Sequence, residues 1–194
     1  MDGEEPITGI GWFPGDAGVL LLHDREADAS ADSWGDWADW FAQLGYAVLA
    51  VDLPENASAK HVQAAIAELR TRVGGKAFIV GAGETVALLD GSMADGFVLI
   101  APRGEALDPL AMGAAPKLIL AGTQDGSAFS IVERFARGCR GWSLLSTFVT
   151  ENTMAALLDG RHALQIGSQI AGFLQEYRRP VTAQRPGAAR PRRS

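Results

Sequence analysis

The sequence predicts a single-domain α/β protein of three layers, in which helices cover both faces of a mostly parallel sheet. Short, continuously apolar runs alternate along the chain with segments of helical period. Strands that are apolar on both faces are typical of a parallel sheet buried between helices. The length of 194 residues suffices for one domain with a substantial core and is too short for two ordinary domains.

Six apolar runs are the expected strands of this sheet. Each run is short, and most are bounded by Gly, Pro or Asp, which favours a buried strand over a helix. The runs are residues 18–22, 46–51, 77–80, 97–101, 117–121 and 142–149. The preceding segment, residues 7–14, is expected to add a short antiparallel strand at the edge of the sheet.

Five further segments are expected to be helices, because their apolar residues recur with a period near that of the α-helix. In the first, Ser33 and Asp36 fit a capping box, and Gly45 fits the left-handed position that ends many helices. Four of the segments are residues 33–44, 59–73, 130–137 and 163–177. The fifth follows the glycines at positions 81 and 83 and extends to about residue 89.

The composition excludes several classes of protein. Hydrophobic residues make up 47% and charged residues 21%, which is the balance of a globular protein. The apolar runs are far shorter than the roughly 20 residues that span a bilayer, and the acidic N-terminus lacks the order of a signal peptide. The single cysteine, Cys139, excludes an internal disulfide, and the three histidines show no metal-ligand spacing. We therefore expect a cytoplasmic protein with no membrane contact, no metal and no cofactor.

The C-terminal segment differs in charge from the rest of the chain. Residues 178–194 hold six arginines, no acidic residue and almost nothing apolar, so we expect a disordered basic tail after a folded domain of residues 1–177. Removing these six charges from the net charge of −6 leaves −12 on the domain. Because phosphate contacts need clustered cations, so acidic a domain is not expected to bind nucleic acid.

Candidate functional residues follow the predicted strands, because ligands and catalytic groups of parallel sheets gather at the carboxyl ends of the strands. They fall into six groups along the chain. These groups are His23, Asp24 and Arg25; Asp52; residues 81–85; Pro102 and Arg103; Asp125; and residues 150–153.

The order of the first segments resembles the start of an α/β hydrolase. An apolar strand ends in His-Asp within residues 18–24, a helix is entered through a Trp in residues 34–46, and a strand ends in Asp-Leu-Pro in residues 48–54. The resemblance covers residues 18–177. Because no long insertion follows Ala101, the chain is similar to the small, lidless dienelactone-hydrolase-like type. The resemblance implies an α/β-hydrolase fold.

The resemblance also implies a degenerate catalytic triad. The family places its nucleophile in a Gly-x-Ser-x-Gly elbow between a strand and a helix. Residues 81–85 read Gly-Ala-Gly-Glu-Thr, so Gly83 stands where the serine should be. The family histidine falls near Thr153, and the nearest histidine is His162. Asp125 matches the triad acid, so Asp125 and His162 are the catalytic residues that the resemblance implies.

An oxyanion pocket is the second element that the resemblance implies. His23-Asp24 stands in place of the family His-Gly, and a backbone N–H donor is expected near Arg25. Any residue supplies such a donor. His23, Asp24, Arg25, Gly83 and Glu84 are therefore the expected residues of an oxyanion site or ligand pocket.

These observations favour a non-catalytic protein that binds a small molecule or a protein partner. The alternative is an active hydrolase of a small ester, lactone or thioester, using Asp125, His162 and a displaced nucleophile. Candidates for that nucleophile are Ser127, Glu84 and Cys139. A structural subunit of a larger complex is a third possibility. Dinucleotide binding fits less well, because Val86 stands in place of a small residue and Glu84 would repel a phosphate.

Overall fold

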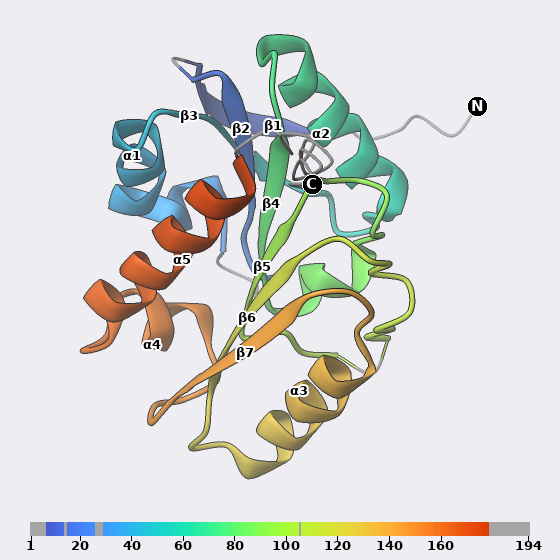
Figure 1. Ribbon diagram of the computed structural model, residues 1–194, viewed down its shortest axis with the longest axis vertical. Coiled ribbons are helices and arrows are strands. Elements are labelled where there is room, and N and C mark those ends of the chain that lie inside the picture. The colour runs from blue at the N-terminus through green and yellow to red at the C-terminus, as the bar shows by residue number, and fades with distance from the viewer. Residues whose placement is uncertain (1–6, 14, 26–28, 105, 179–194) are drawn as a thin grey trace, which may run out of the picture.

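The predicted sheet is present in a computed structural model that describes residues 7–13, 15–25, 29–104 and 106–178 (Figure 1). Its seven strands follow the order β1-β3-β2-β4-β5-β6-β7. Every neighbouring pair is parallel except β1 and β3, which are antiparallel, so the expected edge strand is also confirmed. The strands are β1 (Thr8–Trp12), β2 (Ala17–Leu22), β3 (Tyr46–Asp52), β4 (Ala77–Ala82), β5 (Phe97–Ile100), β6 (Lys117–Gly122) and β7 (Ser143–Phe148).

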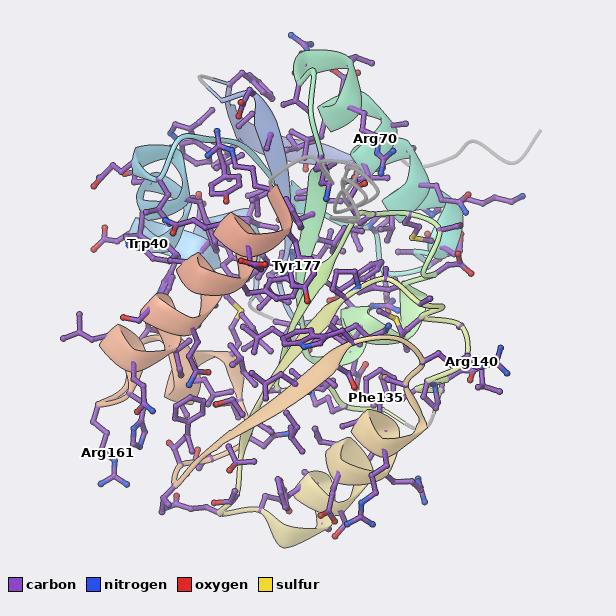
Figure 2. All side chains as sticks on the ribbon, viewed as in Figure 1. Trp40, Arg70, Phe135, Arg140, Arg161 and Tyr177 are labelled. Carbon is purple, nitrogen blue, oxygen red and sulfur yellow. The ribbon has the colours of Figure 1, made fainter. Side chains whose placement is uncertain are left out.

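Helices cover both faces of this sheet. They are η1 (Ala31–Trp34), α1 (Gly35–Gln43), α2 (Ala59–Arg72), η2 (Gly83–Leu88), α3 (Gly126–Gly138), α4 (Met154–Leu158) and α5 (Ala163–Arg178), where η marks a 3₁₀ helix. Figure 1 shows α1, α4 and α5 on one side of the strands and α2 and α3 on the other. In Figure 2, Trp40 and Tyr177 lie on the first side and Phe135 on the second, so the three-layer prediction is confirmed.

Two hydrophobic cores result, because successive side chains of a strand point to opposite faces of the sheet. In β2, Val19 and Leu21 belong to the core under α1 and α5, whereas Leu20 and Leu22 belong to the core under α2. All residues of β2, β4, β5 and β6 are buried. Burial on both faces explains why these strands are continuously apolar in sequence, apart from Lys117 at the start of β6, whose ammonium group donates to three backbone carbonyl oxygens.

The start of the first helix differs from the prediction. The capping box is formed by Ser30 and Ser33, and the Ser30 N–H donates to Ser33 Oγ at 3.0 Å. A 3₁₀ turn precedes α1, so Ser33 lies inside the helical segment and is not its first cap. Gly45 has a φ of 83°, which is the left-handed conformation expected for it.

Two other helices depart from the predicted boundaries. The helix predicted over 130–137 begins already at Gly126, because the Asp125 side chain caps its first turn. The short helix α4 is absent from the prediction. Its five residues are too few for a helical period to be recognised in the sequence.

The boundary of the folded domain also needs one correction. Arg178, assigned to the tail by its charge, is the last residue of α5 and forms an ion pair with Asp16. Its guanidinium also lies over the Tyr46 ring, 4.7 Å from the ring centroid. The rest of the predicted tail, residues 179–194, lies outside the described residues. Within the described part of the chain, no helix is both long and apolar enough to cross a membrane.

Candidate functional site

The turn after β4 has the geometry of a strand-to-helix elbow. β4 ends at Ala82, η2 begins at Gly83, and Gly83 has a φ of 58°, which side chains with a Cβ rarely adopt. The Thr85 hydroxyl donates to the carbonyl oxygen of Ala82 at 2.6 Å and so closes the turn. Thr85 is buried in the place where the family motif has its second glycine.

The carboxylate of Asp24 occupies the space beside Gly83 that a side chain would fill. A Cβ built on Gly83 would lie 1.9 Å from Asp24 Cγ and Oδ2 and 2.0 Å from Oδ1. Asp24 comes so close because it follows β2, which pairs in parallel with β4, so both chains leave the sheet at the same edge. Gly83 and the Asp24 carboxylate therefore share one volume that no larger residue at position 83 can enter without moving Asp24.

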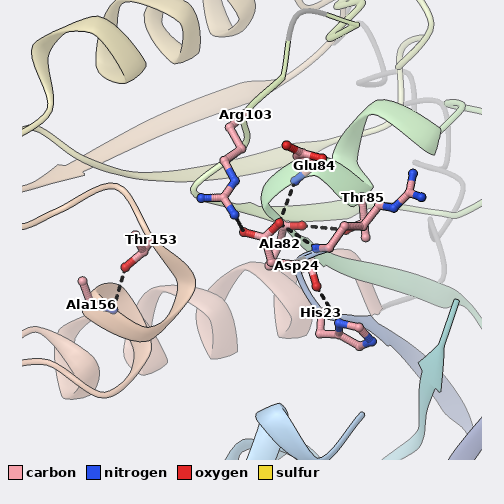
Figure 3. A network of polar contacts seen from close by, with 9 residues as sticks. His23, Asp24, Ala82, Glu84, Thr85, Arg103, Thr153 and Ala156 are labelled. Carbon is pink, nitrogen blue, oxygen red and sulfur yellow. Dashed lines mark hydrogen bonds and ion pairs between the residues drawn. The ribbon is translucent and has the colours of Figure 1, made fainter. Parts of the chain in front are cut away.

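Two backbone N–H groups hold this carboxylate. Asp24 Oδ1 accepts hydrogen bonds from the N–H of Arg25 at 2.8 Å and from the N–H of Glu84 at 3.1 Å (Figure 3). An α/β hydrolase takes its two oxyanion donors from the residue after the nucleophile and from the loop after an earlier strand. By their place after β4 and β2, Glu84 and Arg25 are the residues that the sequence resemblance leads us to expect there. Their distances to Oδ1 match those of an oxyanion hole, about 2.7–3.1 Å.

Arg103 completes the surroundings of Asp24. Its Nη2 lies 2.7 Å from Asp24 Oδ2, and the Asp24 side chain is only 5% exposed. Because a buried carboxylate is costly unless it is paired and hydrogen-bonded, Arg103 and the two N–H groups together stabilise it.

The backbone at Arg103 is hydrogen-bonded to the turn at Gly83. The N–H of Arg103 donates to the carbonyl oxygen of Gly83 at 3.2 Å. Ala101, at the end of β5, has a φ of 46°, which is uncommon for a residue other than glycine. This sharp turn brings the chain back from β5 to the elbow. The sequence places Arg103 after a strand but gives it no role, since its partner is distant along the chain.

His23 is also held at this edge of the sheet, but its ring does not bind the elbow. Nδ1 lies 2.6 Å from the carbonyl oxygen of Asp24, so Nδ1 carries the proton of that hydrogen bond. Nε2 lies 3.3 Å from Asp52 Oδ1 but makes no hydrogen bond among the described residues, and this oxygen accepts the N–H of Ala31 at 2.6 Å. His23 thus lies where the ends of β2 and β3 meet.

Asp125 and His162 form other contacts. Asp125 Oδ1 accepts the N–H groups of Ser127 and Ala128 and the Ser127 hydroxyl, which caps α3. The hydroxyl contact, together with the two N–H bonds, lowers the pKa of the exposed Asp125 carboxyl. His162 Nε2 accepts from Arg161 Nε at 3.1 Å, and its ring lies 5.3 Å from that of Phe148. Asp125 is thus engaged at the start of α3 and His162 beside β7, and the described residues show no hydrogen bond or ion pair from either side chain to Asp24.

The expected base position, Thr153, is a helix cap. Its Oγ1 accepts the N–H of Ala156 at 3.1 Å, at the start of α4 (Figure 3). Two of the displaced nucleophiles considered above have structural surroundings of their own. The Ser127 hydroxyl donates to Asp125, and burial raises the pKa of the Cys139 thiol, which opposes formation of a reactive thiolate.

A polar cleft of about 450 Å³ adjoins Arg103. Within it, Asn152 is only 6% exposed, and its Oδ1 accepts the N–H of Gly122 at 3.0 Å. Its Nδ2 has no hydrogen-bond partner among the described residues. The cleft is lined by Arg103, Gln124, Asp125, Ala128, Glu151, Asn152 and Thr153. It therefore offers both hydrogen-bond donors and carboxylate acceptors.

A second hollow lies between α1 and the pair α4–α5 and has a volume of about 750 Å³. Trp37, Trp40 and Leu164 are among its lining residues, and Leu164 is 89% exposed. This groove is more apolar than the cleft beside Arg103.

Comparison with solved structures identifies the fold. The dienelactone hydrolase of Anabaena variabilis is 18% identical, with a TM-score of 0.74 over 91% of this chain and 94% of that one. The predicted CIB-like hydrolase of Thermoplasma acidophilum is also 18% identical, with a TM-score of 0.66 over 88% and 92% of the two chains. The monoacylglycerol lipase of Paleococcus ferrophilus is 13% identical, with a TM-score of 0.67 over 89% and 100%.

These likenesses confirm the α/β-hydrolase fold that the sequence predicted. Neither the comparison with protein-family models nor that with curated protein sequences found a match.

Proposed function

We propose that this protein of α/β-hydrolase fold is non-catalytic, because its own Asp24 carboxylate occupies the oxyanion hole. We further propose that it binds a small polar molecule in the cleft beside Arg103. The observation that carries the proposal is the position of Asp24. Its carboxylate lies within 2.0 Å of where a Cβ of residue 83 would be and accepts both oxyanion donors.

Ester hydrolysis by this fold needs a nucleophile, a base and an empty oxyanion hole. Gly83 has no nucleophilic atom, and the hydroxyl of Thr153 caps α4. In a serine protease, loss of the nucleophile alone costs about 10⁶ in kcat. Loss of a single oxyanion donor costs about 10²–10³. An ester carbonyl entering this site would also meet the negative charge of Asp24 at the place where its own negative charge must develop.

Binding in the cleft is supported by its mixture of polar groups. Arg103 and Asn152 supply donors, whereas the exposed carboxylates of Asp125 and Glu151 supply acceptors. Because most of the charge of Arg103 is already balanced by Asp24, the cleft is negative on balance. The proposed ligand is therefore a small molecule that carries both an amine or hydroxyl donor and a carbonyl or hydroxyl acceptor.

The absence of catalysis is tested with activated esters and a fluorophosphonate probe. We expect no turnover of p-nitrophenyl acetate above the buffer rate and no labelling by the probe, because position 83 lacks a side-chain oxygen. Turnover by the wild type that disappears in His162→Ala would overturn the proposal. That result would establish the alternative of an active hydrolase with a displaced nucleophile.

Binding is tested by ligand-detected NMR with a set of small amino alcohols and amino sugars. We expect binding that weakens in Glu151→Ala, which removes an exposed carboxylate of the cleft. Leu164→Ala is the matched control, because it changes an exposed residue of the apolar groove. Equal weakening by both variants, or by neither, would contradict a ligand site in the cleft.

We also propose that the protein is cytoplasmic, which its composition supports. The groove between α1 and α5 supports binding of a protein partner as an additional role.

A further inference from the structure

We propose that the oxyanion hole of this protein is a carboxylate-binding site, which Asp24 occupies in the resting protein and which accepts a small monocarboxylate when that side chain is removed. The inference rests on the proposed function in one respect, since both take the site to be closed by Asp24. It goes further by assigning a ligand class to the site itself.

Three donors from three segments converge on one carboxylate. The N–H of Arg25 follows β2, the N–H of Glu84 follows β4, and the guanidinium of Arg103 follows β5. The first two bind Oδ1 at 2.8 and 3.1 Å, and the third binds Oδ2 at 2.7 Å. Figure 3 shows the guanidinium of Arg103 and the backbone nitrogen of Glu84 facing the Asp24 carboxylate.

These donors are positioned by the backbone and not by Asp24 alone. Parallel pairing of β2 with β4, and of β4 with β5, brings the three strand ends together at one edge. The hydrogen bond from the Arg103 N–H to the Gly83 carbonyl oxygen fixes two of the three segments to each other. The site is therefore preorganised, and it should persist when the Asp24 side chain is shortened.

The chemistry of the donors selects a carboxylate. Both oxygens of the bound group accept hydrogen bonds, and one of them faces a positive charge. A carboxamide of the same shape would have to place its NH₂ group against a donor, which leaves that donor unsatisfied. A phosphate would bring a third oxygen and more charge beside the carboxylates of Asp125 and Glu151 in the cleft. A monocarboxylate is thus the ligand that fits.

Arg103 connects this site to the polar cleft. Its side chain is 29% exposed and lines the cleft while it pairs with Asp24. A carboxylate entering from the cleft would compete with Asp24 for this guanidinium. Because Asp24 is attached to the chain beside the site, its effective concentration is high, and the wild type should resist millimolar formate or acetate.

The test restores the missing group from solution. The Asp24→Ala substitution removes the carboxylate group, which formate can replace. The Asp24→Gly substitution removes the carboxylate together with its methylene group, which acetate can replace. We expect the melting temperature of each variant to fall and then to rise saturably with the matching anion, which should bind at least about tenfold more tightly than to the wild type. The neutral isosteres formamide and acetamide, and chloride at equal ionic strength, should not restore it.

Two controls separate this site from a general effect of the anion. Asp24→Ala combined with Arg103→Gln should lose most of the response to formate, since the charged donor is gone. Asp125 is another carboxylate that accepts two backbone N–H groups, but it is exposed to solvent. Formate should therefore not restore the stability of the Asp125→Ala variant. If Asp24→Ala does not fold unaided, refolding yield in formate against formamide gives the same comparison.

Equal responses to formate and formamide, or equal protection of Asp24→Ala, Asp125→Ala and wild type by formate, would overturn the inference. These readouts do not depend on ester turnover. Ester hydrolysis by the wild type would overturn the proposed function but would leave these stability readouts unchanged. Failure of formate or acetate to bind would overturn the carboxylate site but would not show that the protein is an enzyme.

Discussion

Gly83 and Asp24 depend on each other at the level of single residues. The absence of a Cβ at position 83 leaves room for the Asp24 carboxylate, and that carboxylate satisfies the N–H groups of Arg25 and Glu84. Glycine also permits the φ of 58° without strain. Glycine at position 83 thus serves a structural purpose here, whatever its bearing on catalysis.

A double-mutant cycle between these two residues tests this dependence. Gly83→Ala is expected to destabilise the protein strongly, because the new Cβ must displace the carboxylate and because a positive φ costs an alanine about 1 kcal/mol. In the Asp24→Ala background only the second cost remains. We therefore expect a coupling free energy of about 1–3 kcal/mol from urea denaturation of the four proteins. Additive costs would show that Asp24 does not fill the space beside residue 83.

The same geometry predicts how catalysis responds to engineering. Gly83→Ser alone should not create an esterase, because the introduced hydroxymethyl group and the Asp24 carboxylate cannot share the site and because Thr153 is not a base. Turnover of p-nitrophenyl acetate measures this outcome, with the wild type as the control. A clear gain of turnover in this single variant would contradict the proposal that Asp24 blocks an oxyanion hole.

Several residues that resemble catalytic groups serve as caps at the scale of the elements. Asp125 caps α3, and Thr153 caps α4 through its hydroxyl oxygen. Both lie in the loops that follow strands β6 and β7. In this kind of sheet, such loops hold the starts of helices as well as catalytic groups. A carboxylate or hydroxyl at a helix start has a structural explanation that needs no substrate.

The cap at Asp125 predicts a pH-dependent contribution to stability. Hydrogen bonds from Ser127 and Ala128 lower the pKa of Asp125 in the folded protein. A lowered folded pKa means that the contribution is complete above the unfolded pKa, about 3.9, and is lost as the pH falls through the folded value. Asp125→Ala should therefore be less stable than the wild type at pH 7, and this difference should shrink below about pH 4.

Denaturation of both proteins between pH 3 and pH 7 measures this difference. Asp39→Ala, a change at an exposed aspartate of α1, is the control and should show no comparable narrowing. A difference that stays constant across this range would mean that the carboxylate charge does not contribute to the cap.

The described part of the molecule is held by two cores on either side of one sheet, and helix α5 is attached to it at its C-terminal end. Arg178 forms an ion pair with Asp16 and donates to the carbonyl oxygens of Leu44 and Gly45. Its guanidinium also covers Tyr46. These contacts join the end of α5 to the end of α1 and the start of β3.

Two truncations of the C-terminus separate Arg178 from the basic segment after it. Removal of residues 179–194 is expected to leave the melting temperature unchanged, because that segment has almost no apolar side chain to bury. Removal of residues 178–194 also deletes Arg178 and should lower the melting temperature by about 2–4 °C, which corresponds to about 1 kcal/mol. A large loss in the first truncation would show that the arginines bind the acidic domain.

Local patterns in the sequence are enough to predict the class of fold and the order of nearly all elements. Hydrophobic periodicity is a local property, so it can be recognised in 46–51 or 59–73 without knowing what packs against them. The position of the elbow at Gly83 followed from the same order of strands and helices. The residues that meet at that elbow could be identified only from the three-dimensional packing of the strands. Asp24, Glu84 and Arg103 meet because β2, β4 and β5 pair in parallel and in one particular register, and no local pattern specifies that register.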